Sequence, residues 1–153
     1  DTATTSGATK VNDGNWHHVA VFRNGSVLDV FIDGASQVSS PPTDNARNVG
    51  ANANFAMMAR SDSFLPNGGI LSDVQIYNRA LSAAEIAILG SSRTKGPKFS
   101  GLIHYWPLDG VADGASGDAA TFKDRAGTAN GTGNDGANNT GLTGRAETYL
   151  SYP

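Results

Sequence analysis

Hydrophobic and polar residues alternate along two neighbouring segments near the start of the chain, residues 17–23 and 27–33. Such alternation is typical of β-strands that bury one face. The Asn24-Gly25 pair between the segments suits the positive φ angles of a tight hairpin turn, and Asp33-Gly34 offers a second turn of this kind. The pattern therefore predicts an antiparallel meander of three strands, the third near residues 35–38.

A third alternating run, residues 70–77, leads into a short predicted helix. Ser82 and Glu85 have the spacing of a capping box, in which a hydroxyl and a carboxylate accept hydrogen bonds from free amides at a helix start. We expect the helix to cover residues 83–89 and to end at Gly90, because glycine is common just beyond a helix.

The remaining strands are predicted from shorter patterns. Residues 110–144 are rich in Gly, Asn and Thr and can bury little apolar surface, so long loops are expected there. The segment 91–100 is polar and has the composition of a linker. Further short strands are expected at residues 49–52, 55–59, 102–108, 120–122 and 146–152. These elements indicate the all-β class, with antiparallel strands and one short helix.

Composition narrows the function classes. The chain has 153 residues, a formal net charge of −3 and only 16% charged residues, so it lacks the basic footprint of a nucleic-acid-binding domain. It has no cysteine, which excludes disulfides and thiolate metal sites. No apolar stretch approaches the roughly 20 residues of a membrane span. The first residue is Asp1 and no leader-like segment follows it, so we expect a processed product or a piece of a longer protein.

Two groups of segments carry a resemblance to a known family. The run Trp16–Ala20, the Asp33-Gly34 turn and the run Ser72–Ser82 resemble the closing half of a laminin-G-like jelly roll, a fold of the concanavalin A-like lectin and glucanase superfamily. The run Gly101–Gly110, followed by Asp124 and Gly127–Gly131, resembles the opening half. The resemblance covers about residues 13–89 and 101–152, and it implies an antiparallel two-sheet jelly-roll sandwich.

The order of the two halves is reversed relative to the family. Residues 1–90 correspond to the closing half, 91–100 to a linker and 101–153 to the opening half, so they form either one permuted domain or two halves exchanged between copies. An incomplete sandwich leaves strand edges that can pair with another copy. We therefore expect self-association, and we favour a neighbouring chain over residues 102–108 of the same chain as the partner of the closing half.

The resemblance also implies a possible structural calcium ion, which such folds often hold where their first and last strands meet. Calcium takes carboxylate, carbonyl and amide oxygen ligands. By position, Asp73 and Asp109 would face each other across that junction, with Asp124 as a third ligand. The alternative, in which Asp73 and Asp109 accept hydrogen bonds from turn amides, stays open. A zinc site is disfavoured because the adjacent His17 and His18 point to opposite faces of a strand.

Aromatic side chains offer candidate sugar contacts, because their faces suit the apolar faces of pyranose rings. Trp16 and Trp106 occupy strand positions that normally fill a core. Loops on a rigid scaffold carry function more often. The predicted loop 61–67 and the residue before it therefore supply the candidate ligand-binding residues, which are Arg60, Asp62 and Phe64.

Catalysis is not expected. Glycoside hydrolysis needs two carboxyl groups about 5–10 Å apart, but Glu85 is assigned to the capping box and Glu147 is isolated. The resemblance instead implies a non-catalytic, lectin-like module that binds carbohydrate or another cell-surface ligand outside the cell. The alternative is a structural repeat protein that forms a fibre, sheath or adhesin by exchanging half-domains, and a glycanase is a third, less favoured hypothesis.

Overall fold

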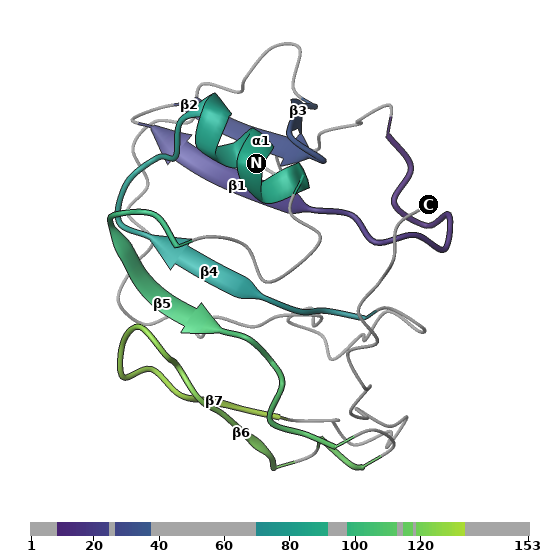
Figure 1. Cartoon of the computed structure of the whole chain (residues 1–153), viewed down its shortest axis with the longest axis vertical. Coiled ribbons are helices and arrows are strands. Elements are labelled where there is room, and N and C mark those ends of the chain that lie inside the picture. The colour runs from purple at the N-terminus through teal and green to yellow at the C-terminus, as the bar shows by residue number, and fades with distance from the viewer. Residues whose placement is uncertain are drawn as a thin grey trace. The chain divides into compact units, whose positions relative to one another are not determined.

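The computed structural model describes residues 9–24, 27–37, 70–91, 98–112, 115–117 and 119–133 (Figure 1). The chain divides into two compact units. The first contains strands β1 (Val19–Asn24), β2 (Val27–Ile32) and β3 (Ala35–Ser36), and helix α1 (Ala83–Ser91). The second contains strands β4 (Val74–Tyr77), β5 (Leu102–Trp106), β6 (Thr121–Phe122) and β7 (Gly131–Thr132).

The sheet of the first unit is an antiparallel meander in the order β1-β2-β3. Asn24 pairs with Val27 across the first connection. The second connection is the Asp33-Gly34 turn, whose φ angles of 51° and 80° are both positive, as a two-residue turn of type I′ requires. The predicted meander is thus confirmed, although its third strand has only two residues.

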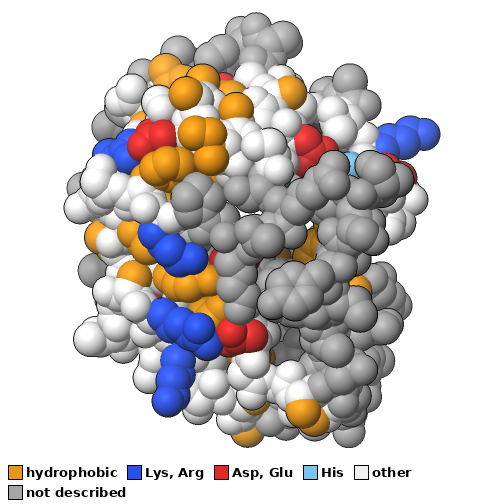
Figure 2. Space-filling view, in the orientation of Figure 1, with side chains coloured by type: hydrophobic (Ala, Val, Ile, Leu, Met, Phe, Trp, Pro, Cys, Tyr) orange, Lys and Arg blue, Asp and Glu red, His pale blue; other side chains and the backbone are white. Residues whose placement is uncertain are grey.

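Helix α1 begins where the capping box predicts. The Glu85 carboxylate accepts a hydrogen bond from the backbone N–H of Ser82 at 2.8 Å, and the Ser82 hydroxyl accepts one from the N–H of Glu85 at 3.3 Å. Ile86, 1% exposed, and Leu89, 9% exposed, form the buried side of the helix, which Figure 1 shows lying across the sheet. Ile88 lies on the exposed side, and Figure 2 shows hydrophobic side chains at the surface over α1.

The expected end of the helix at Gly90 is wrong, because α1 continues through this residue to Ser91. Gly90 serves instead for close packing. A Cβ atom placed there would lie 2.8 Å from the Gly34 nitrogen and 2.9 Å from the Asp33 carbonyl carbon. The glycine therefore lets the helix backbone contact the β2–β3 turn, and it is not a helix terminator.

In the second unit, β4 pairs antiparallel with β5 of the same chain, with Val74 opposite Trp106. The alternating run was expected to be extended from residue 70, but the strand begins at Val74 because Asp73 has a left-handed φ of 56°. The pairing also bears on the expected partner of the closing half. For β4 this partner is β5, so the preference for a neighbouring chain is not supported at this strand.

A second antiparallel pair, β6 with β7, lies in the same unit and joins Thr121 to Thr132. The short strand expected at residues 120–122 is confirmed as β6. Its partner β7 lies in the segment that the composition predicted to be loop. The pairing of only two residues explains this error, since so short a strand has no detectable alternation.

The all-β class with antiparallel sheets and one helix is confirmed for the part of the chain described above. The strands expected at residues 49–52, 55–59 and 146–152 lie outside the described residues. No helix in the described part is long and apolar enough to cross a membrane.

Candidate functional site

The second unit is organised around the carboxylate of Asp124, which follows β6. Alternation along residues 121–125 turns Asp124 inward, where its residue is 9% exposed and its side chain is inaccessible. Its oxygen atoms accept five hydrogen bonds of 2.6–3.1 Å, from the backbone N–H groups of Tyr105, Ala126, Gly127 and Ala129 and from His104 Nδ1. The carboxylate thus ties the loop after β6 to strand β5.

Burial alone would raise the pKa of Asp124. The hydrogen bonds from the Tyr105 amide, the His104 ring and the loop amides outweigh burial and hold this pKa well below its ordinary range. The ring of His104 stacks on Trp106, with centroids 5.3 Å apart. Trp106 is 5% exposed, as expected for a core side chain, and its indole N–H donates to the Ala129 carbonyl at 2.8 Å.

An open pocket of about 170 Å³ lies next to this arrangement. Its lining residues come from the segment after β5 and from β6 with its continuation, and they are Pro107, Leu108, Asp109, Gly110, Thr121, Phe122, Lys123 and Arg125. All belong to the second unit. The pocket combines apolar and charged groups, as small-molecule sites commonly do.

An ion pair forms part of the pocket wall. Arg125 Nη2 donates to both oxygen atoms of Asp109, at 2.9 and 3.0 Å. The backbone N–H of Arg125 donates to the Tyr105 carbonyl at 2.7 Å, which fixes the start of this side chain against β5. Leu108, next to Asp109, has a left-handed φ of 58°. Non-glycine residues in this conformation are uncommon and often occur at functional sites.

Asp73 lies near the pocket segment, because its backbone N–H donates to the Pro107 carbonyl at 3.5 Å. Its carboxylate accepts hydrogen bonds from the Tyr105 hydroxyl and, at 3.2 Å, from Gln75 Nε2. Burial and this carboxylate raise the pKa of Tyr105 well above its ordinary value, so the hydroxyl remains protonated and donates to Asp73.

Asp73, Asp109 and Asp124 are the predicted calcium ligands. A calcium ion needs oxygen atoms that converge on one point. Within the described ranges no group of three or more His, Asp or Glu side chains could hold a metal. Asp124 is surrounded by N–H donors, and Asp109 faces a guanidinium. The described geometry does not fit an ion held by these three residues, and calcium binding by this chain stays a prediction.

The first unit contains a histidine held between two carboxylates. His17 contacts Asp33 through Nδ1 at 2.7 Å and Asp13 through Nε2 at 3.0 Å, and its side chain is 13% exposed. Hydrogen bonds to Asp33 and Asp13 raise the pKa of His17 above its ordinary value of 6.5. The Asp33 carboxylate also accepts the backbone N–H of His18 at 2.9 Å. These contacts link the start of β1 to the β2–β3 turn.

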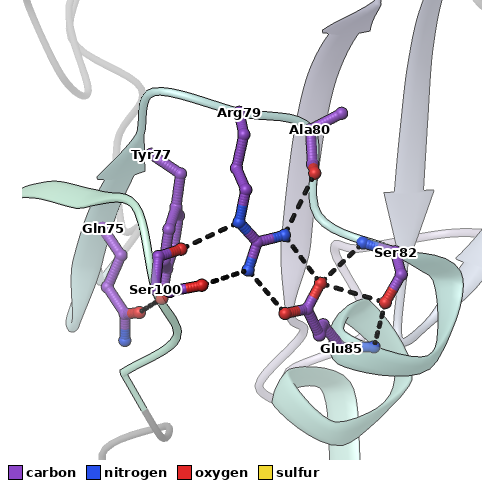
Figure 3. A network of polar contacts seen from close by, with 7 residues as sticks. All are labelled: Gln75, Tyr77, Arg79, Ala80, Ser82, Glu85 and Ser100. Carbon is purple, nitrogen blue, oxygen red and sulfur yellow. Dashed lines mark hydrogen bonds and ion pairs between the residues drawn. The ribbon is translucent and has the colours of Figure 1, made fainter.

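The carboxylate of Glu85 is fully engaged at the start of α1 (Figure 3). Arg79 donates to its two oxygen atoms at 2.6 and 2.9 Å, and Ser82 donates from its N–H and hydroxyl groups. Arg79 Nε also donates to the Ser100 carbonyl at 2.9 Å. The hydrogen bonds from Arg79 and then Ser82 lower the pKa of Glu85 to about 2. A carboxylate of this kind cannot act as a general acid near neutral pH.

The candidate ligand residues Arg60, Asp62 and Phe64 lie outside the described residues, as does Glu147. The pocket-lining residues Lys123 and Arg125 were missed from the sequence. Two cationic residues two positions apart in sequence were the available signal, but the glycine-rich surroundings favoured a loop interpretation. Asp124 was singled out as a metal ligand, whereas in the structure backbone amides surround it.

In the described residues, the antiparallel sheets and the capped helix are consistent with the β-sandwich class. A family model described as the concanavalin A-like lectin/glucanases superfamily matches residues 1–87, and the chain belongs to this laminin-G-like family. The match contains almost all of the segment that resembles a closing half, whereas the resemblance of residues 101–152 to an opening half stays a prediction. No curated protein and no solved structure matches the chain.

Proposed function

We propose that this chain is a non-catalytic, extracellular carbohydrate-binding module, with its binding site in the open pocket of the second unit. The superfamily contains both lectins and glucanases, so the fold does not choose between them. The observation that carries the proposal is the chemistry of the pocket wall. It combines the Asp109–Arg125 ion pair with apolar groups from Leu108 and Phe122.

Sugars present hydroxyl groups that donate and accept hydrogen bonds, beside apolar C–H faces. A carboxylate and a guanidinium held side by side supply an acceptor and donors in fixed positions. Because the ion pair and the backbone contact of Arg125 hold this wall in place, little side-chain ordering is needed on binding. Because the pocket is open, a bound sugar unit could belong to a longer chain.

The described carboxylates offer little for hydrolysis. Glu85 is held by Arg79 and Ser82, and Asp124 is enclosed by N–H donors. Asp29 accepts hydrogen bonds from Ser36 and from the N–H of Val30. Domains of this family are generally non-catalytic. Incubation with polysaccharides should therefore release no new reducing ends.

A pair of threonine variants tests the location of the site. Thr121 is exposed and lines the pocket, so Thr121→Trp should fill it and abolish binding of carbohydrates selected on a glycan array. Thr128 is exposed but does not line the pocket, and Thr128→Trp should bind as the wild type does. Calorimetric titration measures both, after circular dichroism has shown that each variant folds. Equal binding by the two variants would remove the pocket from the proposal.

A structural, self-associating role is the second candidate. Val19 and Val21 are 55% and 63% exposed and share one face of β1. Exposed β-branched residues on such a strand favour association between copies. Val21→Lys should then lower the concentration-dependent mass measured by sedimentation equilibrium, whereas Val11→Lys, at a similarly exposed site, should not. A monomer at every concentration contradicts this second role.

A further inference from the structure

We infer that the pocket of the second unit takes an acidic sugar, whose carboxylate or sulfate ester is bound by Lys123 and Arg125. The inference rests on the proposed carbohydrate binding and specifies its ligand class. Three observations carry it, namely the place of Lys123 and Arg125 in the pocket lining, the donor atoms left open at the wall, and the charge of the pocket.

The two cationic residues, Lys123 and Arg125, both line the pocket. Within residues 121–125, Phe122 and Asp124 are the less exposed residues, and the Asp124 carboxylate accepts hydrogen bonds from backbone N–H groups such as that of Gly127. Thr121, Lys123 and Arg125 are exposed and line the pocket. Phe122 lines the same pocket, so two cationic residues border it beside an aromatic one.

The ion pair leaves donor atoms available for a ligand. Both side-chain hydrogen bonds described for Arg125 leave from Nη2, so Nε and Nη1 retain N–H groups. Lys123 has three N–H donors, and the described part of the chain gives it no carboxylate partner. An anionic group in the pocket could therefore accept from both side chains while Asp109 keeps its contact with Arg125.

The charge of the pocket favours an anion over a neutral sugar. Its wall has two cationic side chains and one carboxylate, although the whole chain has a net charge of −3. Asp109 positions the guanidinium but also repels an incoming anion. This double role predicts that removing the charge of Asp109 strengthens binding of an acidic sugar, an effect that loss of folding could not produce.

The test compares three forms of one oligosaccharide. The first carries uronic acid carboxylates, the second is a neutral form in which these carboxyl groups are reduced to alcohols, and the third is the reduced form with sulfate esters added. Calorimetric titration at low salt measures the affinity of the intact chain for each form. We expect the carboxylated or the sulfated form to bind about three- to tenfold more tightly than the neutral form, as one or two solvent-exposed charge contacts would give. Whichever anion binds more tightly identifies the source of the charge.

Three variants assign the effect to the pocket. Lys123→Gln should remove most of the preference for the acidic form over the neutral form. Lys10→Gln makes the same charge change at an exposed residue of the first unit and should change neither. Asp109→Asn should increase affinity for the acidic form. Thermal unfolding by circular dichroism confirms that each variant is folded.

The outcomes separate this inference from the proposed function. If acidic and neutral forms bind equally, or if Lys10→Gln weakens binding as much as Lys123→Gln does, the acidic specificity is wrong while carbohydrate binding stands. If no form binds and the glycan array is also blank, both are wrong.

Discussion

Gly90 offers the sharpest test of the packing in the first unit, because two physical effects predict opposite results for Gly90→Ala. In an exposed helix interior, alanine is more favourable than glycine by about 1 kcal/mol. The structure predicts a loss instead. The new Cβ would lie 2.8 Å from the Gly34 nitrogen and 2.9 Å from the Asp33 carbonyl carbon, well inside ordinary contact distance.

The contacted atoms decide the magnitude. They belong to the backbone of the β2–β3 turn, so no side chain can rotate away, and either the helix or the turn has to shift. Overpacking of this kind costs about 1–3 kcal/mol. Taking about 3 kcal/mol for a rigid neighbour and subtracting about 1 kcal/mol of helix propensity leaves a net destabilisation of about 2 kcal/mol.

The assay is urea unfolding followed by circular dichroism at the helix band, with the slope of the transition used to check cooperativity. Ala84→Gly is the control, because Ala84 is an exposed residue of the same helix. Propensity alone predicts a loss of about 1 kcal/mol there. A Gly90→Ala variant that is more stable than the wild type would refute the close contact between α1 and the turn.

Three further predictions concern polar contacts. Asp124→Asn should lower the midpoint of thermal unfolding more than Asp109→Asn. It should also reduce the loss of stability as the pH falls below about 4, because a carboxyl group with a lowered pKa stabilises fully above its ordinary pKa and progressively less below it. His17→Asn should destabilise the chain more at a pH of about 6 than at about 9. The raised pKa of His17 contributes fully to stability below 6.5, and this contribution is lost as the pH rises through the pKa of the folded state. An equal loss of stability at both pH values would contradict the contacts of His17 with the two carboxylates. Ser82→Ala should cost about 1 kcal/mol in urea unfolding, and an unchanged midpoint would show that the capping box contributes nothing.

Local chemistry made the first unit largely predictable from sequence. The Asp33-Gly34 turn and the Ser82–Glu85 capping box depend on neighbours within a few residues, and both are present as expected. Gly90 shows the limit of this approach. Its surroundings along the chain suggest a helix end, whereas its role is set by a turn far away in sequence.

The candidate site could be predicted only in part, because its groups come from segments about 15 residues apart. Asp109 and Asp124 were recognised as carboxylates of interest, yet their partners are a guanidinium and a set of amides respectively. Sequence pattern cannot distinguish these partners from a cation, since calcium and N–H donors attract the same oxygen atoms. Lys123 was missed because its sequence position does not show that the fold places it in one pocket lining with Arg125.

The β2–β3 turn takes part in three features of the first unit, namely the hairpin, the histidine contacts and the packing of the helix. Asp33 and Gly34 reverse the chain, the Asp33 carboxylate accepts from His17 and His18, and Gly34 lies against the helix backbone. Two residues thus connect the hairpin, the histidine contacts and the helix. Amide hydrogens of β2 and α1 should therefore exchange with solvent at similar opening free energies, because neither element can open while the turn keeps its conformation.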